Sequence, residues 1–185
     1  MRPVLLLVDF QEEWRDKKSN YYLGEFKLKL RNAGLLLEHF HRRDWPVILT
    51  RHVEVGSKTA FSEGTKGTQI ISDLKVNPSD HVLTKNKISP FYRTDLERIL
   101  KEMQANELVI GGVMTNLCVR SAIADAYDRD YHIRIVTDAC VSDSSKVDEF
   151  TFKDLKKTRP EVELIRTRDF ITKSNEDKSS AVTTR

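Results

Sequence analysis

The chain has 185 residues, of which 39% are hydrophobic and 32% are charged, values typical of a globular domain with a sizeable core. The 31 basic and 28 acidic residues are interspersed and give a net charge of +3, which excludes a basic stripe for nucleic acid. No apolar segment approaches the roughly 20 residues that cross a bilayer, and no signal-peptide pattern precedes the first strand. We therefore expect a cytoplasmic protein that binds neither nucleic acid nor membrane.

Apolar strands alternate with amphipathic helices along the chain. The predicted strands are 4–8, 47–50, 82–84, 108–113, 133–136 and 163–166, and the predicted helices are 26–43, 68–74, 95–104, 118–129 and 148–157. This βαβ repetition predicts an α/β fold of three layers, α/β/α, in which helices cover both faces of a mostly parallel sheet. The order of the strands cannot be read from the spacing.

Residues 1–172 are expected to form a single domain. Residues 173–185 are polar and have nothing to bury, so we expect a flexible C-terminal tail. His39 and His41 lie on a basic helix face and are expected to be solvated surface residues.

Reactive side chains follow three of the predicted strands. Asp9 ends the apolar run 4–8, Lys85 follows 82–84, and Cys118 follows a strand that breaks at two glycines. Open α/β sheets bind ligands outside the carboxyl ends of their strands, so these groups are candidates for chemistry at one edge. Taken singly, Asp9 could be a helix N-cap, Lys85 a solvated charge and Cys118 a small buried hydrophobe.

Cys118 is predicted to stand at the start of a helix, where unpaired N–H groups and the helix dipole stabilise a thiolate. The chain has two cysteines, and a disulfide with Cys140 would remove this reactivity, so we expect both to be reduced. Gly111 and Gly112 lack the third glycine of a dinucleotide-binding motif. No nicotinamide or other cofactor is therefore expected.

Four segments carry motifs in a fixed order. VDFQEEW at residues 8–14 is similar to D-M-Q-x-x-F, and KNKISPFYRTDL at 85–96 to K-x-x-x-S-A-F-x-x-T-x-L. GVMTNLCV at 112–119 is similar to G-V-x-T-x-x-C-V, and VTDAC at 136–140 to the V-x-D-A strand end. Over residues 3–170 the chain thus resembles the isochorismatase-like cysteine hydrolases, which include nicotinamidases, N-carbamoylsarcosine amidohydrolases and ureidoacrylate amidohydrolases. The resemblance implies a six-stranded Rossmann-like sheet and a homo-oligomer, either a dimer or a tetramer.

The resemblance also implies a catalytic triad of Asp9, Lys85 and Cys118, with Lys85 favoured over Lys87 as its lysine. Asp9 would accept and return protons, Lys85 would stabilise anionic charge, and Cys118 would be the nucleophile. An oxyanion would be bound by the backbone N–H groups of Met114 and Cys118. The peptide bond that precedes Met114 would be cis.

Four further residues are predicted to bind substrate: Gln11, Trp14, Phe91 and Leu117. For Gln11 the alternative is that its amide satisfies loop backbone groups. For Trp14, which replaces the usual phenylalanine of the motif, and for Phe91, the alternative is ordinary core packing.

No metal site is predicted. Nicotinamidases carry the motif D-x-H-x-x-x-x-x-H at the end of their second strand, which corresponds to residues 47–50 here. In this chain Thr50 stands two residues before His52, and the next histidine is His81. A single histidine cannot hold a divalent ion, because catalytic sites usually present three protein ligands. Nicotinamide is therefore disfavoured as the substrate.

These observations predict a cysteine hydrolase that cleaves a small amide, carbamoyl or ureido C–N bond through a thioester, without metal or cofactor. One alternative is an isochorismatase-type vinyl-ether hydrolase, in which the aspartate is the acid and the cysteine is dispensable. The other is a binding or redox-sensing module that keeps the pocket but does not turn over substrate.

Overall fold

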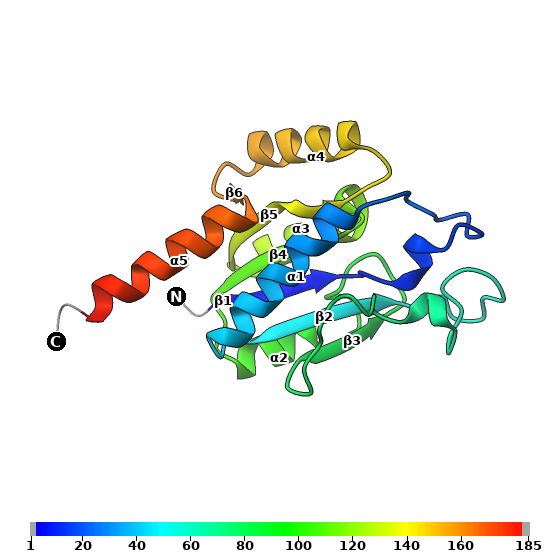
Figure 1. The fold of residues 1–185 in the computed structure, drawn as a ribbon, viewed down its shortest axis with the longest axis horizontal. Helices are drawn as coiled ribbons and strands as arrows, with labels where there is room; N and C mark the ends of the chain where they lie inside the picture. The colour runs from blue at the N-terminus through cyan, green and yellow to red at the C-terminus, as the bar shows by residue number, and fades with distance from the viewer. Residues whose placement is uncertain (1–2, 183–185) are drawn as a thin grey trace.

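The computed structural model describes residues 3–182. Six strands form one sheet in the order β3-β2-β1-β4-β5-β6, and all neighbouring strands are parallel (Figure 1). This arrangement confirms the predicted α/β class. The strands are β1 (Pro3–Val8), β2 (Val47–His52), β3 (His81–Lys85), β4 (Glu107–Val113), β5 (His132–Val141) and β6 (Glu163–Ile165).

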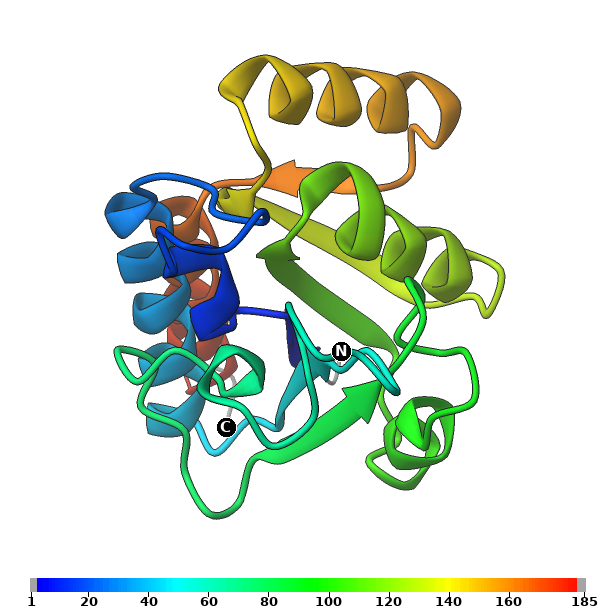
Figure 2. The same cartoon turned by 90° about the vertical axis from the view of Figure 1, so that its right-hand side faces the viewer.

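Helices cover both faces of the sheet, with α1 and α5 on one side and α2 and α3 on the other (Figure 2). The helices are α1 (Lys27–Arg42), α2 (Leu96–Glu102), α3 (Arg120–Tyr127), α4 (Ser145–Thr158) and α5 (Thr167–Val182), with shorter turns η1 (Glu12–Arg15), η2 (Lys66–Thr68) and η3 (Thr115–Val119). Within residues 3–182, no helix is long and apolar enough to cross a membrane.

The continuous apolar run of β1 supplies two cores. Leu5 and Leu7 pack in the core under α1 and α5, whereas Val4, Leu6 and Val8 pack in the core under α2 and α3. Successive side chains of a strand point to opposite faces, so a central strand of a three-layer fold must be apolar on both.

The predicted helix over residues 68–74 is absent from the β2–β3 connection. That segment contains turns, and the Ile71 N–H donates to the carbonyl of Phe10 at 2.9 Å. Ile71 and Leu74 are buried, and their spacing imitates one face of a helix. The pattern therefore identified the buried positions correctly but not the backbone, which pairs with the loop after β1.

The predicted boundary at residue 172 falls inside α5, which continues to Val182. Phe170 and Ser174 of this helix are buried, and the Ser174 hydroxyl lies 2.8 Å from Nε2 of His39. The prediction of a solvated His39 is wrong, because α5 covers it and leaves it 3% exposed. Burial lowers the pKa of His39 to about 4. Residues 183–185 of the predicted tail lie outside the described part of the chain.

A glycine allows β1 and β4 to meet closely at the carboxyl edge of the sheet. Gly112 has a φ of +155°, and a Cβ at this position would lie 2.5 Å from the carbonyl oxygen of Val8. Any larger residue would push the two strand ends apart. Gly112 thereby brings the residue after β1 close to the turn after β4.

Candidate active site

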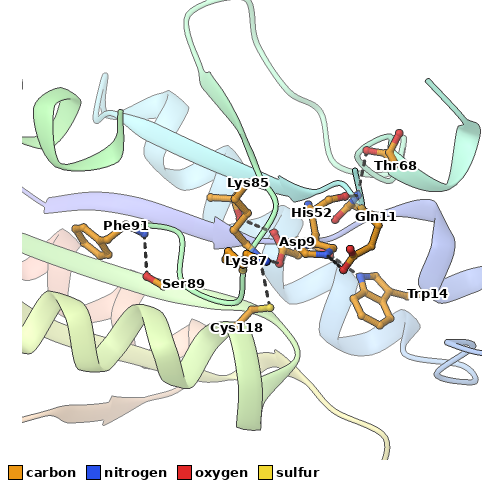
Figure 3. Close-up of polar contacts among 12 residues, drawn as sticks. Asp9, Gln11, Trp14, His52, Thr68, Lys85, Lys87, Ser89, Phe91 and Cys118 are labelled. Atoms are coloured by element: carbon orange, nitrogen blue, oxygen red, sulfur yellow. Dashed lines mark hydrogen bonds and ion pairs between the residues drawn. The ribbon is translucent and has the colours of Figure 1, made fainter. Parts of the chain in front are cut away.

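Asp9, Lys85 and Cys118 meet at the carboxyl edge of the sheet (Figure 3). Asp9 directly follows β1, Lys85 is the last residue of β3, and Cys118 lies in η3 after β4. Because β2 separates β3 from β1, the Lys85 side chain reaches over the end of β2 to Asp9. The three residues that the sequence predicted to converge are thus in contact.

Lys85 is the centre of this arrangement. Its Nζ lies 2.6 Å from Oδ2 of Asp9, 3.0 Å from the carbonyl oxygen of Lys87 and 3.4 Å from Sγ of Cys118. The ammonium donates hydrogen bonds to the Lys87 carbonyl and the Cys118 sulfur, and it forms an ion pair with Asp9. The Asp9 and Lys85 side chains are fully buried, whereas Lys87 is exposed and contributes its backbone oxygen. This geometry agrees with the choice of Lys85 over Lys87.

Asp9 is held from several directions. Its Oδ1 accepts a hydrogen bond from Thr50 Oγ1 at 2.6 Å, and its carbonyl accepts one from the Trp14 indole N–H at 2.7 Å. Its backbone is left-handed, with a φ of +53°, a conformation that aspartate tolerates better than most residues. The N-cap of η1 is Gln11, so the N-cap alternative does not describe Asp9.

The Cys118 thiol is a weak acid in this environment. Its pKa is raised to about 11, first by burial and then by the negative charge of Asp9, which together outweigh the opposing charge of Lys85. The expectation of a stabilised thiolate is therefore wrong for the resting protein. Cys118 is the fourth residue of η3 and stands two residues before the start of α3.

The turn that carries Cys118 is a π-helix, η3, and α3 begins after it. The N–H groups of Leu117 and Val119 both donate to the carbonyl of Met114 at 3.1 Å. The peptide bond between Val113 and Met114 is cis, as the resemblance implied. Single π turns occur frequently at functional sites.

The side-chain amide of Gln11 satisfies backbone groups, which is the alternative to substrate binding that the sequence left open. Its Nε2 donates to the carbonyls of His52 at 2.8 Å and Thr68 at 3.1 Å, and its Oε1 accepts from the His52 N–H at 2.7 Å. The side chain is fully buried. Gln11 therefore ties the end of β2 to η2, and both of its amide protons are used there.

The other predicted substrate-binding residues differ in exposure. Trp14 is 6% exposed and packs edge-on against Phe61, and Phe91 is 7% exposed beneath the guanidinium of Arg129. Core packing accounts for these two aromatic residues in this structure. Leu117 is 43% exposed beside Cys118, so it is open to a ligand.

His52 lies next to the site without forming a metal centre. It is the partner of Lys85 in the β2–β3 register, and its Nε2 lies 2.8 Å from a carboxylate oxygen of Glu54. Among the residues that the structure describes, no group of three or more His, Cys, Asp or Glu could hold a metal ion. Independence from metal stays a prediction.

Two residues of this region were missed by sequence reasoning. Thr50 follows the apolar part of β2, so the strand-end pattern that identified Asp9 could also have identified it. Asn116 Oδ1 is buried and has no hydrogen-bond partner among residues 3–182. Nothing in the sequence signals that this oxygen would be unpaired.

A family model described as "Isochorismatase domain" matches residues 3–169. The chain belongs to the isochorismatase family. The uncharacterized family member YddQ of Bacillus subtilis is 27% identical over 80% of this chain and 83% of its own length. Ureidoacrylate amidohydrolase RutB of Methylorubrum extorquens is 31% identical over 55% of this chain and 40% of its own length. The crystal structure of N-carbamoylsarcosine amidase from Thermoplasma acidophilum matches with a TM-score of 0.79 and 25% identity, covering 90% of this chain and 97% of that one. As a member of this family, whose named relatives are hydrolases, the chain is a hydrolase.

Proposed function

We propose that this family member hydrolyses a C–N bond of a small amide, carbamoyl or ureido compound by covalent catalysis from Cys118. The observation that carries the proposal is the contiguity of Asp9, Lys85 and Cys118, with Lys85 Nζ 2.6 Å from the carboxylate and 3.4 Å from the sulfur. A nucleophile, a base and a cation in mutual contact are the parts that acyl transfer requires.

The raised pKa of Cys118 defines the first step. At neutral pH the thiol is protonated, so Asp9 takes its proton while Sγ bonds to the carbonyl carbon. The carbonyl electron pair moves to oxygen, and the backbone N–H groups of Met114 and Cys118 stabilise the oxyanion. Donors of this kind are each worth about 3 to 4 kcal/mol in the barrier.

The tetrahedral intermediate then collapses. Asp9 returns its proton to the leaving nitrogen, the C–N bond breaks, and a thioester on Cys118 remains. Water next attacks the thioester and gives a proton to Asp9, the C–S bond breaks, and the thiolate regains that proton. Throughout, Lys85 stabilises the negative charge that moves between carboxylate, sulfur and substrate.

The substrate class is supported by the chemistry of the proposed site. A nucleophile paired with a base that can return a proton suits a leaving nitrogen, because the nitrogen must be protonated as its C–N bond breaks. The names of two relatives, ureidoacrylate amidohydrolase and N-carbamoylsarcosine amidase, agree with this class.

The raised pKa of Cys118 also bears on the redox-sensing alternative. Sensor cysteines are characteristically of low pKa and accessible, because the thiolate is the species that oxidises. Cys118 has the opposite property, with a pKa of about 11. The resting thiol is therefore a poor target for direct oxidation, and its attack on a substrate requires a base such as Asp9.

An ammonia-release screen over small amides, carbamoyl compounds and ureides tests the proposal. The expected result is turnover that Cys118→Ala abolishes and Cys140→Ala retains, with an acyl adduct on Cys118 detected by intact mass. Vinyl-ether cleavage that survives Cys118→Ala would overturn it. Stoichiometric oxidation of Cys118, with no turnover on any member of the library, would do the same.

A further inference from the structure

A buried carboxylate lies behind the turn that carries Cys118. Asp148, on α4, is 5% exposed, and its Oδ1 accepts hydrogen bonds from the hydroxyls of Thr115 at 2.5 Å and Ser142 at 2.6 Å. Its Oδ2 pairs with the ammonium of Lys29 on α1. These four residues, the Asp148 cluster, join α1, η3, α4 and the end of β5, and they are distinct from the proposed triad.

Thr115 links this cluster to the nucleophile. It is fully buried and is the first residue of η3, whose backbone hydrogen bonds return to the carbonyl of Met114. A threonine hydroxyl can rotate, and the acceptor at Asp148 fixes it in one direction. Because η3 is a single turn, a shift of its first residue also moves Cys118.

The hydrogen bonds within the Asp148 cluster are stronger than residues that only fill space would need. Hydrogen bonds to an ionised acceptor are roughly twice as strong as those to a neutral acceptor. The ammonium of Lys29 compensates the buried negative charge of Asp148. An apolar residue of similar volume would fill the same space without this ion pair, and such replacements are often neutral for stability. A directional role for the carboxylate therefore explains the arrangement better than space-filling does.

We propose that Asp148 is a positioning residue: through Thr115 it fixes η3 so that Cys118 Sγ and the backbone N–H groups of the turn keep their places. Asp148 touches neither Cys118 nor the proposed base. The catalytic meaning of this inference rests on the proposed function, whereas its effect on the turn can be measured without a substrate.

A matched pair of double variants isolates the hydrogen bond from the charge. Lys29→Met with Asp148→Asn removes both charges but keeps an acceptor at residue 148. Lys29→Met with Asp148→Leu has the same net charge and nearly the same side-chain shape, but no acceptor. The comparison of the two variants therefore reports on the acceptor that faces Thr115 and Ser142.

The control is Asp154 on the same helix. Its carboxylate pairs with Arg120 of α3, so it also joins α4 to a neighbouring helix, but it makes no contact with Thr115. Asp154→Asn should lower stability slightly and leave turnover and the reactivity of Cys118 unchanged.

We expect the leucine double variant to have a kcat about 10- to 100-fold below that of its asparagine counterpart, with a similar KM, because small misplacements of reacting groups cost rates of this size. The rate of Cys118 alkylation by iodoacetamide should also change several-fold between the two, without any substrate present. Equal kcat and equal alkylation rates, with a difference confined to the melting temperature, would overturn the positioning role.

Single substitutions of Thr115 cover the case in which the leucine variant does not fold. Thr115→Val keeps the shape but removes the donor, so it should reproduce the loss of kcat. Thr115→Ser keeps the donor, so its kcat should stay close to that of the wild-type protein. Equal behaviour of these two variants would overturn the inference. If the wild-type protein hydrolyses no amide but the alkylation rates still differ as expected, then the proposed function fails while the positioning role stands.

Discussion

Two ion pairs with buried carboxylates lie at opposite edges of the same sheet. Asp9 and Lys85 form one at the carboxyl edge, with 2.6 Å between Oδ2 and Nζ. Glu107 and Arg134 form the other near the starts of β4 and β5, with 2.6 Å between Oε1 and Nη1. The two pairs match in charge and distance, but they differ in what surrounds them.

The pair at the amino edge is surrounded by further structural contacts. Arg134 also binds the carboxylate of Glu163 at 2.8 Å and lies 5.9 Å from the ring of Phe170, so it ties the starts of β4, β5 and β6 together. Burial raises the pKa of Glu107 despite the charge of Arg134. A buried charge in this fold therefore does not by itself indicate chemistry, and the edge of the sheet on which it lies is the more informative property.

The largest expected difference between the two pairs is in turnover. Asp9→Asn and Lys85→Met should each lower kcat/KM by at least ~10³-fold, and their combination should be little worse, because members of a catalytic unit are not additive. Lys87→Met and Arg134→Met should retain activity. Steady-state kinetics on the substrate found by the screen checks this, and additive losses would contradict a triad.

The second expected difference is in stability. Arg134→Met leaves Glu107 buried without its cation and should lower the free energy of unfolding by about 3 kcal/mol at neutral pH, the usual cost of breaking a buried pair. The loss should shrink as the pH falls. The already raised pKa of Glu107 will rise further without Arg134, and below that pKa the folded state holds a neutral carboxyl group. Urea titrations at pH 7 and pH 5 measure both effects, and an undiminished loss at pH 5 would contradict the argument.

The ionisation of Cys118 gives a third, smaller test. With a pKa of about 11, its alkylation by iodoacetamide should keep increasing from pH 7 to pH 10, whereas a free cysteine approaches its limit near pH 9. Asp9→Asn removes a charge that raises this pKa and should speed alkylation at pH 8 while turnover is lost. Lys85→Met should slow it. Peptide mapping measures these alkylation rates, with buried Cys140 as the internal reference. If both substitutions changed the rate in the same direction, the opposing effects assigned to Asp9 and Lys85 would be contradicted.

The smallest expected effect is that of chelation. Since His52 lies within no group of potential metal ligands among residues 3–182, exhaustive treatment with EDTA should leave turnover unchanged, and His52→Ala should largely retain it. Elemental analysis should find well under one metal per chain. A stoichiometric metal whose removal abolishes activity would point to ligands outside this arrangement and would favour a nicotinamidase-like site.

Local patterns in the sequence predicted a large part of the site. The apolar runs before Asp9 and before the turn of Cys118 are β1 and β4, which are buried along their whole length, and buried parallel strands are visible as continuous apolar segments. Lys85 ends the edge strand β3, most of which is exposed, so its position was marked less clearly. The same rule missed Thr50, although it stands where β2 turns polar. It also could not identify Asp148, since a carboxylate on an amphipathic helix looks like any other polar residue.

The sequence by itself determined the parallel α/β fold, the edge of the sheet at which the candidate residues would lie and the types of side chain that meet there, because apolar runs and strand ends are local properties of the chain. The tertiary structure alone decided that Lys85 spans β2 to reach Asp9, that α5 covers His39, and that the pKa of the Cys118 thiol is raised rather than lowered. Desolvation and the distances between charges depend on elements far apart in the chain. Their balance at Cys118, where burial and Asp9 outweigh Lys85, exists only after those elements have packed.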